Sequence, residues 1–332
     1  MDQAAPVSAA VERGHTTLMR VRFWGVRGSI PSPIPPQAIR NKIASVVQRV
    51  RPEDLESTSS RERFLATLPP WLFGTYGGNS ACIEARLSDN SCVVFDAGSG
   101  IREFARFVAN EPTPISEFHV FITHFHYDHL QGLPFFGPAY NPNVKLTFYS
   151  PVAGFEEIVR GHMKPPYFPV TMDAAMESNI IFKVLEGDSV EIGSGTVSWR
   201  RHKHPGGAVA YRVEEANRAL IFSTDTELQE SDFEKNDQNR RFYGGVEMII
   251  LDSQYTLGEA IEKYDWGHSS FSLGVDFVTA WGIRQLYMYH HDPLYDDHRL
   301  YKNLQSARWY ARSLGNSELE VYVSEEGLEV DL

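Results

Sequence analysis

Short apolar runs recur along the chain and are separated by turns rich in glycine, proline and asparagine. Runs of four to eight residues with alternating or continuous apolar character are typical of strands. The runs that predict strands are residues 19–24, 80–87, 92–95, 118–122, 144–149, 180–184, 197–201, 208–213, 219–222, 248–251, 286–289, 319–323 and 327–330. The second and third runs flank Ser88-Asp89-Asn90, which predicts a hairpin.

Apolar residues spaced three or four apart predict helices between these strands. The predicted helices cover residues 38–50, about 101–109, 152–161, 270–281 and 297–314. Strands and helices are mixed, and hairpins occur in both halves. This order predicts an α/β fold in which two mixed β-sheets are flanked by helices, rather than a simple βαβ repeat.

Residues 33–73 predict a helical insertion over the first loop. Four prolines between positions 31 and 36 exclude regular structure there, and the helical spacing begins after them. The insertion could be a lid or a surface decoration. For the rest of the chain we expect a flexible leader at 1–18 and a single domain over 19–332.

Composition excludes several classes of protein. The chain has 332 residues, 42% of them hydrophobic, and a net charge of −12. This acidic balance argues against a protein that grips long nucleic acid through a basic face. Two cysteines are too few for a disulfide scaffold. We find no signal-peptide pattern and no apolar run long enough to span a membrane, so we expect a cytoplasmic protein.

The densest chemistry follows the apolar run at 118–122. There, Thr123-His124-Phe125-His126-Tyr127-Asp128-His129 places four potential metal ligands within six residues. Imidazole and carboxylate together suit zinc or a similar first-row metal ion. A ligand placed at a strand end is held rigidly, as a preorganised site requires. The segment therefore predicts a metal site.

This segment, followed by Gly132, resembles the signature of the metallo-β-lactamase-fold hydrolases. Other motifs of that family appear in order after strands or turns. They are Phe95-Asp96-Ala97-Gly98, His204-Pro205-Gly206-Gly207, Thr224-Asp225 and His290. The resemblance covers about residues 19–323 and implies an αββα sandwich.

The resemblance also implies the metal ligands. His124, His126 and His204 would hold one ion. Asp128, His129 and His290 would hold a second, and Asp225 would bridge the two. The ions implied are two divalent cations, with zinc expected first and manganese or iron as alternatives.

The roles of four further residues must be decided separately. His202 lies two residues before His204, and His291 adjoins His290. We select His204 and His290 as ligands on the family pattern and on strand position. We expect Asp96 to order the loop beneath the metals. Asp252 is either near the site or a plain cap.

Two sequence segments resemble the phosphodiesterase branch of the family, which includes RNase Z and cyclic-nucleotide phosphodiesterases. They are Asp252-Ser253-Gln254-Tyr255 and Trp266-Gly267-His268-Ser269-Ser270. In that branch a hydroxide held between the metals attacks phosphorus. We expect His268 to protonate the leaving oxygen, although it could instead cap the next helix. Asp128 could also orient the attacking water.

The predicted substrate contacts are less specific. Tyr167 and Phe168 lie in a proline-rich loop and could stack on a nucleobase or fill an apolar gap. Arg27 and Asn79 are polar loop residues that could face the pocket or serve turns.

The leading functional hypothesis is a binuclear phosphodiesterase acting on a small nucleotide, with a 3′,5′-cyclic nucleotide favoured. A tRNA 3′-end endonuclease is one alternative, but residues 133–175 contain no glycine- and lysine-rich arm for tRNA. A thioester or lactone hydrolase would use the same ligands. The expected partners are a small anionic nucleotide and a second copy in a homodimer, with neither long nucleic acid nor a membrane.

Overall fold

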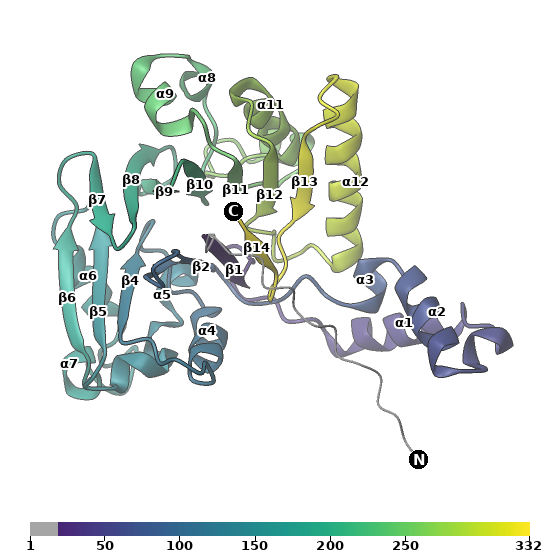
Figure 1. Ribbon diagram of the computed structural model, residues 1–332, viewed down its shortest axis with the longest axis horizontal. Coiled ribbons are helices and arrows are strands. Elements are labelled where there is room, and N and C mark those ends of the chain that lie inside the picture. The colour runs from purple at the N-terminus through teal and green to yellow at the C-terminus, as the bar shows by residue number, and fades with distance from the viewer. Residues whose placement is uncertain (1–18) are drawn as a thin grey trace.

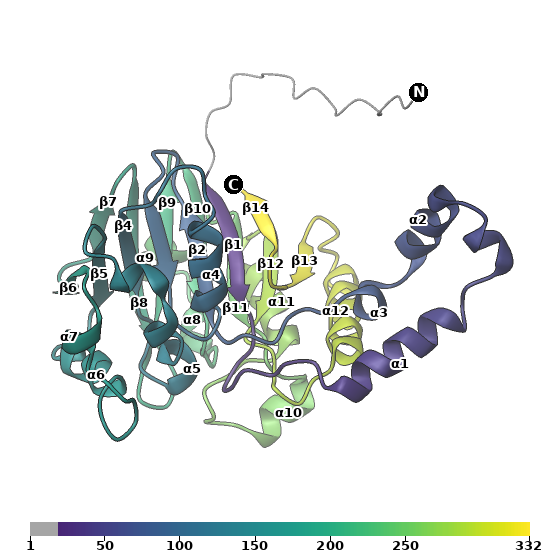
Figure 2. The same ribbon diagram turned by 90° about the horizontal axis from the view of Figure 1, so that it is seen from below.

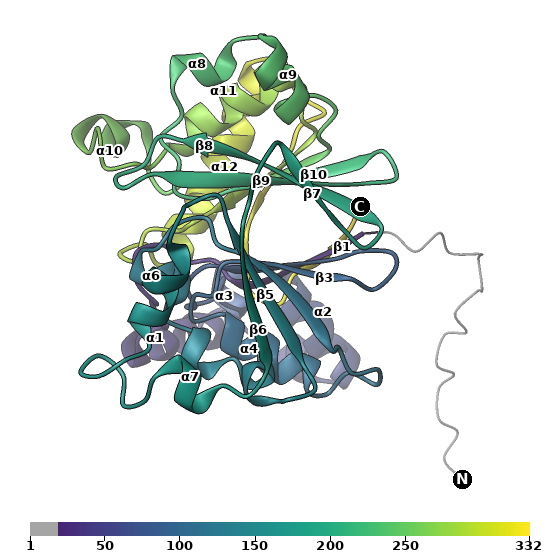
Figure 3. The ribbon, with the colours of Figure 1, turned by 90° about the vertical axis from the view of Figure 1, so that its left-hand side faces the viewer.

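Two β-sheets pack face to face, and helices cover their outer sides (Figure 1, Figure 3). The computed structural model describes residues 19–332, where each sheet contains seven strands. The predicted leader at 1–18 lies outside the described residues. This architecture confirms the predicted α/β fold with two mixed sheets between helices.

The first sheet is antiparallel at one side and parallel at the other. Its order is β14 (Glu329–Asp331), β1 (Arg20–Gly25), β2 (Cys82–Arg86), β3 (Cys92–Phe95), β4 (Glu117–Phe121), β5 (Lys145–Ser150) and β6 (Asn179–Val184). The pairs from β14 to β3 are antiparallel, and those from β3 to β6 are parallel.

The second sheet repeats this division. Its order is β13 (Glu320–Val323), β12 (Gln285–Tyr289), β11 (Met248–Asp252), β10 (Arg218–Ser223), β9 (Ala208–Glu215), β8 (Gly195–His202) and β7 (Ser189–Ile192). The pairs from β13 to β10 are parallel, and those from β10 to β7 are antiparallel. Because parallel strands end at the same edge, both sheets can deliver side chains to one site.

Helices and short turns connect the strands. They are α1 (Pro36–Val47), η1 (Pro52–Leu55), α2 (Thr58–Thr67), α3 (Pro70–Phe73), α4 (Ile101–Val108), α5 (Tyr127–Leu130), η2 (Leu133–Phe135), η3 (Gly137–Tyr140), α6 (Phe155–His162), α7 (Met172–Ala175), α8 (Glu230–Phe233), α9 (Asp237–Tyr243), α10 (Leu257–Glu262), α11 (Phe271–Trp281) and α12 (Asp297–Ser313). Among the described residues, none of these helices has the length and apolar character needed to cross a bilayer.

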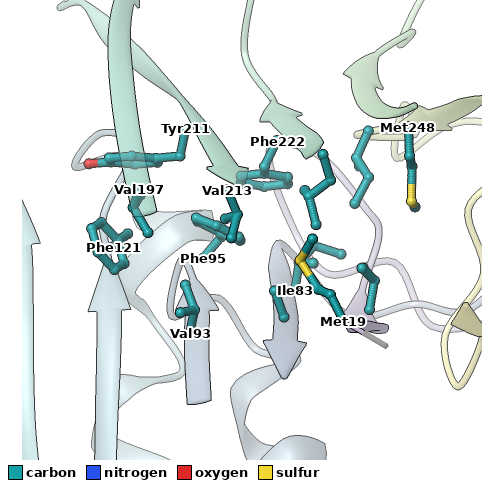
Figure 4. Close-up of a cluster of buried hydrophobic side chains, with 14 of the residues drawn as sticks. Met19, Ile83, Val93, Phe95, Phe121, Val197, Tyr211, Val213, Phe222 and Met248 are labelled. Carbon is teal, nitrogen blue, oxygen red and sulfur yellow. The ribbon is translucent and has the colours of Figure 1, made fainter. Parts of the chain in front are cut away.

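The main core lies between the sheets. Phe95 and Phe121 from the first sheet meet Tyr211 and Phe222 from the second (Figure 4), and all four side chains are buried. Two further clusters fill the outer faces, one beneath α4 and α6 and one beneath α11 and α12. Burial on both faces explains why most strands appear in the sequence as continuous apolar runs.

The helical segment within 33–73 protrudes from the sheets. Figure 2 shows α1 and α2 reaching away from the rest of the molecule, and neither helix contains a buried residue. At the base of this segment, Lys42 pairs with Asp297, and the Trp71 ring lies 4.4 Å from the His298 ring, centre to centre.

Most predicted strands appear within a residue or two of the expected position, but short elements were missed. The edge strand β7 has only four residues, with a single buried one, so its apolar pattern is weak. The helices α8, α9 and α10 are also short, and their sequences are mostly polar. Capping hydrogen bonds rather than an apolar face mark their beginnings.

Candidate metal centre

A cluster of histidine and aspartate side chains lies where strands of both sheets end. His124 and Asp128 follow β4 of the first sheet, whereas Asp225 and His290 follow β10 and β12 of the second. The sheets are joined at this edge, because Val209 donates its main-chain N–H to the Thr123 carbonyl over 3.1 Å. The packing of the two sheets therefore determines the spacing of the cluster.

The first group brings together three histidines and one aspartate. His126 Nδ1 lies 3.0 Å from His124 Nε2 and 3.2 Å from His204 Nε2. Asp225 Oδ1 is 3.7 Å from Nε2 of both His124 and His204. Only His126 of these four is exposed, so the group opens to solvent at that side chain.

The second group shares the same aspartate. Asp225 Oδ2 lies 3.1 Å from both His129 Nε2 and His290 Nε2. Asp128 Oδ2 lies 3.1 Å from His129 Nε2 and 3.3 Å from His290 Nε2. The two oxygens of Asp225 thus face separate groups, as a bridging carboxylate requires.

The spacing and chemistry of both groups fit metal ions. Ligand atoms about 2.1 Å from a tetrahedral zinc ion lie about 3.4 Å from one another. The distances above, from 3.0 to 3.7 Å, bracket that value. In addition, His129 Nε2 is buried without a hydrogen-bond partner among the described residues. A buried nitrogen left unpaired between two carboxylates is explained by a cation at that position.

Other groups orient the ligands from behind. His129 Nδ1 lies 2.8 Å from Asp96 Oδ2, which fixes the ring so that Nε2 faces the cluster. His204 Nδ1 donates to the Gly267 carbonyl over 2.9 Å. Such partners determine which ring nitrogen is free to ligate. The remaining contacts are His124 Nδ1 with Thr123 Oγ1, His290 Nδ1 with Gln254 Oε1, and the Ser29 N–H with Asp128 Oδ2.

Electrostatics keep the first group ready to ligate. Burial lowers the pKa of both His124 and His204, so their rings are neutral and offer lone pairs. Burial alone would raise the pKa of Asp225, but the surrounding histidines outweigh it and hold this pKa well below its usual range. Asp225 is therefore ionised.

The second group has a different balance. Burial alone would lower the pKa of His129, but Asp128, Asp225 and Asp96 raise it well above its usual range. Three carboxylates thus concentrate negative charge around one imidazole. A divalent cation would neutralise this charge and displace the proton, as metal binding to histidine does in general.

His268 lies against the second group without belonging to the predicted ligand set. Its ring stacks on His290 with centres 5.0 Å apart, and one ring nitrogen is within 4.8 Å of ligand atoms of Asp225 and His290. Asp252 Oδ2 lies 2.7 Å from His268 Nδ1. Although burial lowers the pKa of His268, Asp252 outweighs it and raises this pKa to about 9. The following helix is capped by Ser270, not by His268.

All seven predicted ligands come together, whereas the two adjacent histidines do not join them. His202 Nε2 is buried and has no hydrogen-bond partner among the described residues. His291 Nε2 lies 2.8 Å from the Ser324 carbonyl. Asp96 orders the loop beneath the cluster, as expected. Asp252 lies near the site, where it contacts His268 and also accepts the main-chain N–H groups of Gln254 and Ser269.

Two predicted substrate contacts have other partners in the structure. Arg27 is buried and donates from Nε to the Gly77 carbonyl over 2.9 Å and from Nη1 to the Tyr295 carbonyl over 2.7 Å. Asn79 donates to Glu326 Oε2 over 2.9 Å. These contacts support the alternative role of both residues in holding loops together, and their role as substrate contacts stays a prediction.

The two aromatic candidates differ from each other. Phe168 is half-buried, contacts the core beneath α6, and has its ring 6.2 Å from that of Phe135. It therefore fills the apolar gap that was its alternative role. Tyr167 is 74% exposed, so its ring is free to meet a ligand, and its role in stacking stays a prediction.

Sequence reasoning missed the groups that position the ligands. A Cβ on Gly28 would lie 2.2 Å from His290 Nδ1, and one on Gly267 would lie 2.3 Å from His204 Nδ1. Gln254 and the Ser29 main chain were also missed. Their only sequence signal is proximity to the motifs, since their ligand partners are distant in the chain.

Comparison with known proteins identifies the family. A family model described as a beta-lactamase superfamily domain matches residues 92–291, which is more than half of the chain. Among curated proteins, no significant match is found.

Solved structures share the fold over nearly their whole length. YhfI from Bacillus subtilis, a metallo-β-lactamase fold protein, has a TM-score of 0.63 and 14% identity, covering 96% of this chain and 100% of its own. A diphosphatase of the PhnP family has a TM-score of 0.59 and 13% identity, and the match covers 95% of this chain and 98% of the diphosphatase. The short form of human tRNase Z has a TM-score of 0.59 and 15% identity, and the match covers 94% of this chain and 99% of the tRNase. The chain belongs to the β-lactamase superfamily and has the metallo-β-lactamase fold.

Proposed function

We propose that the chain is a metal-dependent hydrolase that cleaves small nucleotide phosphodiesters, with a 3′,5′-cyclic nucleotide as the favoured substrate. The observation that carries this proposal is the pair of ligand groups joined through Asp225, with His268 beside them. Two divalent cations bound there, zinc being the first expectation and manganese or iron the alternatives, would activate water and neutralise phosphoryl oxygens.

The protein's own residues have separate roles in this proposal. The seven ligands hold the ions, and Asp128, which accepts the Ser29 N–H over 2.8 Å, orients the attacking water. His268, held by Asp252, donates a proton to the departing ester oxygen. General acid catalysis of this kind contributes about 10²–10⁴-fold to a rate.

Net charge supports a small substrate. A chain with a net charge of −12 repels long polyanions, so phosphate binding depends on a local positive centre. We further propose a cytoplasmic location, on the sequence pattern, and a homodimer, on the family resemblance.

A substrate comparison tests the proposed function. The purified enzyme, supplied with zinc or manganese, is assayed on cyclic mononucleotides, precursor tRNA and an acyl thioester. The proposal requires cyclic nucleotides to have the highest kcat/KM. Higher activity on tRNA or on the thioester would overturn it. Asp225→Ala serves as the control, because it removes the shared ligand and should abolish activity on every substrate.

A further inference from the structure

A cavity of about 580 Å³ lies beside His268, between α10, α11 and α12. Of these three helices, α11 and α12 lie on the outer side of the second sheet, and α10 lies at its end (Figure 3). The volume is within the range of about 300–1,000 Å³ that is usual for small-ligand pockets. The cavity is therefore large enough for one organic group of drug size.

The cavity adjoins the metal centre at His268. His268 forms part of its wall, and the same ring lies within 4.8 Å of ligand atoms of Asp225 and His290. A proton donor stands next to the oxygen that leaves. A group attached to that oxygen can extend past the His268 ring along the wall that this ring shares with the cavity.

The lining is mostly apolar, and His268 is its only basic side chain. Leu257, Ile261, Phe271 and Leu273 contribute apolar side chains, and none of the lining residues is lysine or arginine. The ring of Tyr264 adds an aromatic surface on which a base could stack.

The charged groups at the cavity are already paired or negative. Glu227 and Asp276 line it. Lys203 lies beside the cavity, with its Nζ 4.3 Å from the Tyr264 ring centre, but it is bound by Glu227 and Asp265. A further phosphate in the cavity would meet carboxylates without a compensating free cation, which is costly.

We propose that this cavity binds the uncharged body of the leaving group, such as the nucleoside of a cyclic mononucleotide, and selects against substrates with a second phosphate there. The inference rests on the proposed phosphodiesterase function. In the reaction, the water oxygen forms the new bond to phosphorus, and the proton that this water releases replaces the one that His268 gives up. The ester P–O bond breaks with its electron pair on the leaving oxygen, which takes a proton from His268.

Ile261→Trp tests the cavity itself. Ile261 is 69% exposed, so a larger side chain there can narrow the cavity without disturbing the core. We expect KM for a cyclic mononucleotide, and the inhibition constant of free adenosine, to rise about tenfold. A loss of this size is typical when part of an apolar group can no longer be buried. The matched control is Ile158→Trp on α6, an isoleucine that is 40% exposed and does not line the cavity.

The second arm compares substrates. A cyclic dinucleotide carries another phosphodiester on the leaving side, so its kcat/KM should be at least about tenfold below that of a cyclic mononucleotide. Equal or better cleavage of the dinucleotide would overturn the inference. The inference would also be overturned if Ile261→Trp left both KM and the inhibition constant of adenosine unchanged while Tyr167→Ala raised KM for the cyclic mononucleotide. Both results require phosphodiesterase activity in the unmodified enzyme, so they are distinct from failure of the proposed function, in which no phosphodiester is cleaved.

Discussion

At the residue scale, the metal centre depends on backbone conformations that most side chains avoid. Asp96, Asp225 and His290 have left-handed φ angles of 63°, 51° and 60°. Such conformations cost on the order of 1–3 kcal/mol each and persist where the surroundings impose them. Here they turn each side chain sharply from its strand end into the cluster, so strain is concentrated where the ligands must be aimed.

Gly28→Ala is expected to weaken the second metal site. The added methyl group would lie 2.2 Å from His290 Nδ1 and must displace that ring. Displacing an oriented ligand typically costs about 10–100-fold in metal affinity, which competition with a chelating dye measures. Gly258→Ala is the matched control, because a Cβ there meets nothing within 4 Å. Unchanged affinity in Gly28→Ala would show that His290 does not ligate.

His268→Ala is expected to slow hydrolysis most for substrates with poor leaving groups. Loss of the proton donor should lower kcat for a cyclic nucleotide by about 100-fold or more. Hydrolysis of bis-p-nitrophenyl phosphate, whose leaving group needs no proton, should fall less than about tenfold. Metal content should stay unchanged. Equal losses on both substrates would instead favour a role in positioning.

Ligand residues could be predicted from sequence, but their supports could not. The motif around His124 is local, and the resemblance to the family implied the more distant ligands. In contrast, Arg27 and Asn79 each have a hydrogen-bond partner, Tyr295 and Glu326, that lies more than two hundred residues away. Only the folded chain shows that these polar loop residues are already satisfied.

At the element scale, strands were easier to predict than short helices, because most strand residues are buried and therefore apolar. β10 and β11 are buried along almost their whole length. α10, however, has no buried residue and is defined by the Thr256 cap, whose Oγ1 accepts the Glu259 N–H. That helix nevertheless forms a wall of the cavity beside His268, so the element with the weakest pattern bears on substrate choice.

Asp297→Ala is expected to loosen the protruding helices and destabilise the fold. The buried Asp297 carboxylate pairs with Lys42 and accepts hydrogen bonds from Tyr76 N at 3.0 Å and Thr75 Oγ1 at 3.1 Å. Removing one partner of such a buried pair costs about 3 kcal/mol, which urea unfolding measures.

Glu53→Ala, an exposed site within the same protruding segment, is the control for Asp297→Ala and should change stability by less than about 0.5 kcal/mol. A loss below about 1 kcal/mol in Asp297→Ala would show that this anchor contributes little.

At the scale of the whole molecule, the centre exists only when the two sheets are packed together. The first sheet supplies His124, His126, Asp128 and His129, and the second supplies the rest. Metal binding should therefore stabilise the folded state, since the unfolded chain cannot assemble this site. Chelation should lower the thermal midpoint by about 5 °C or more, and re-addition of zinc should restore it. A midpoint insensitive to both treatments would contradict this coupling.

The most direct test of the account is the metal stoichiometry of the purified protein, measured by elemental analysis after equilibration with zinc or manganese. The account predicts two ions per chain in the unmodified protein. Asp225→Ala, which removes the shared carboxylate, should retain fewer than one. A stoichiometry of zero in the unmodified protein, or of two in Asp225→Ala, would contradict a centre of two cations joined through Asp225.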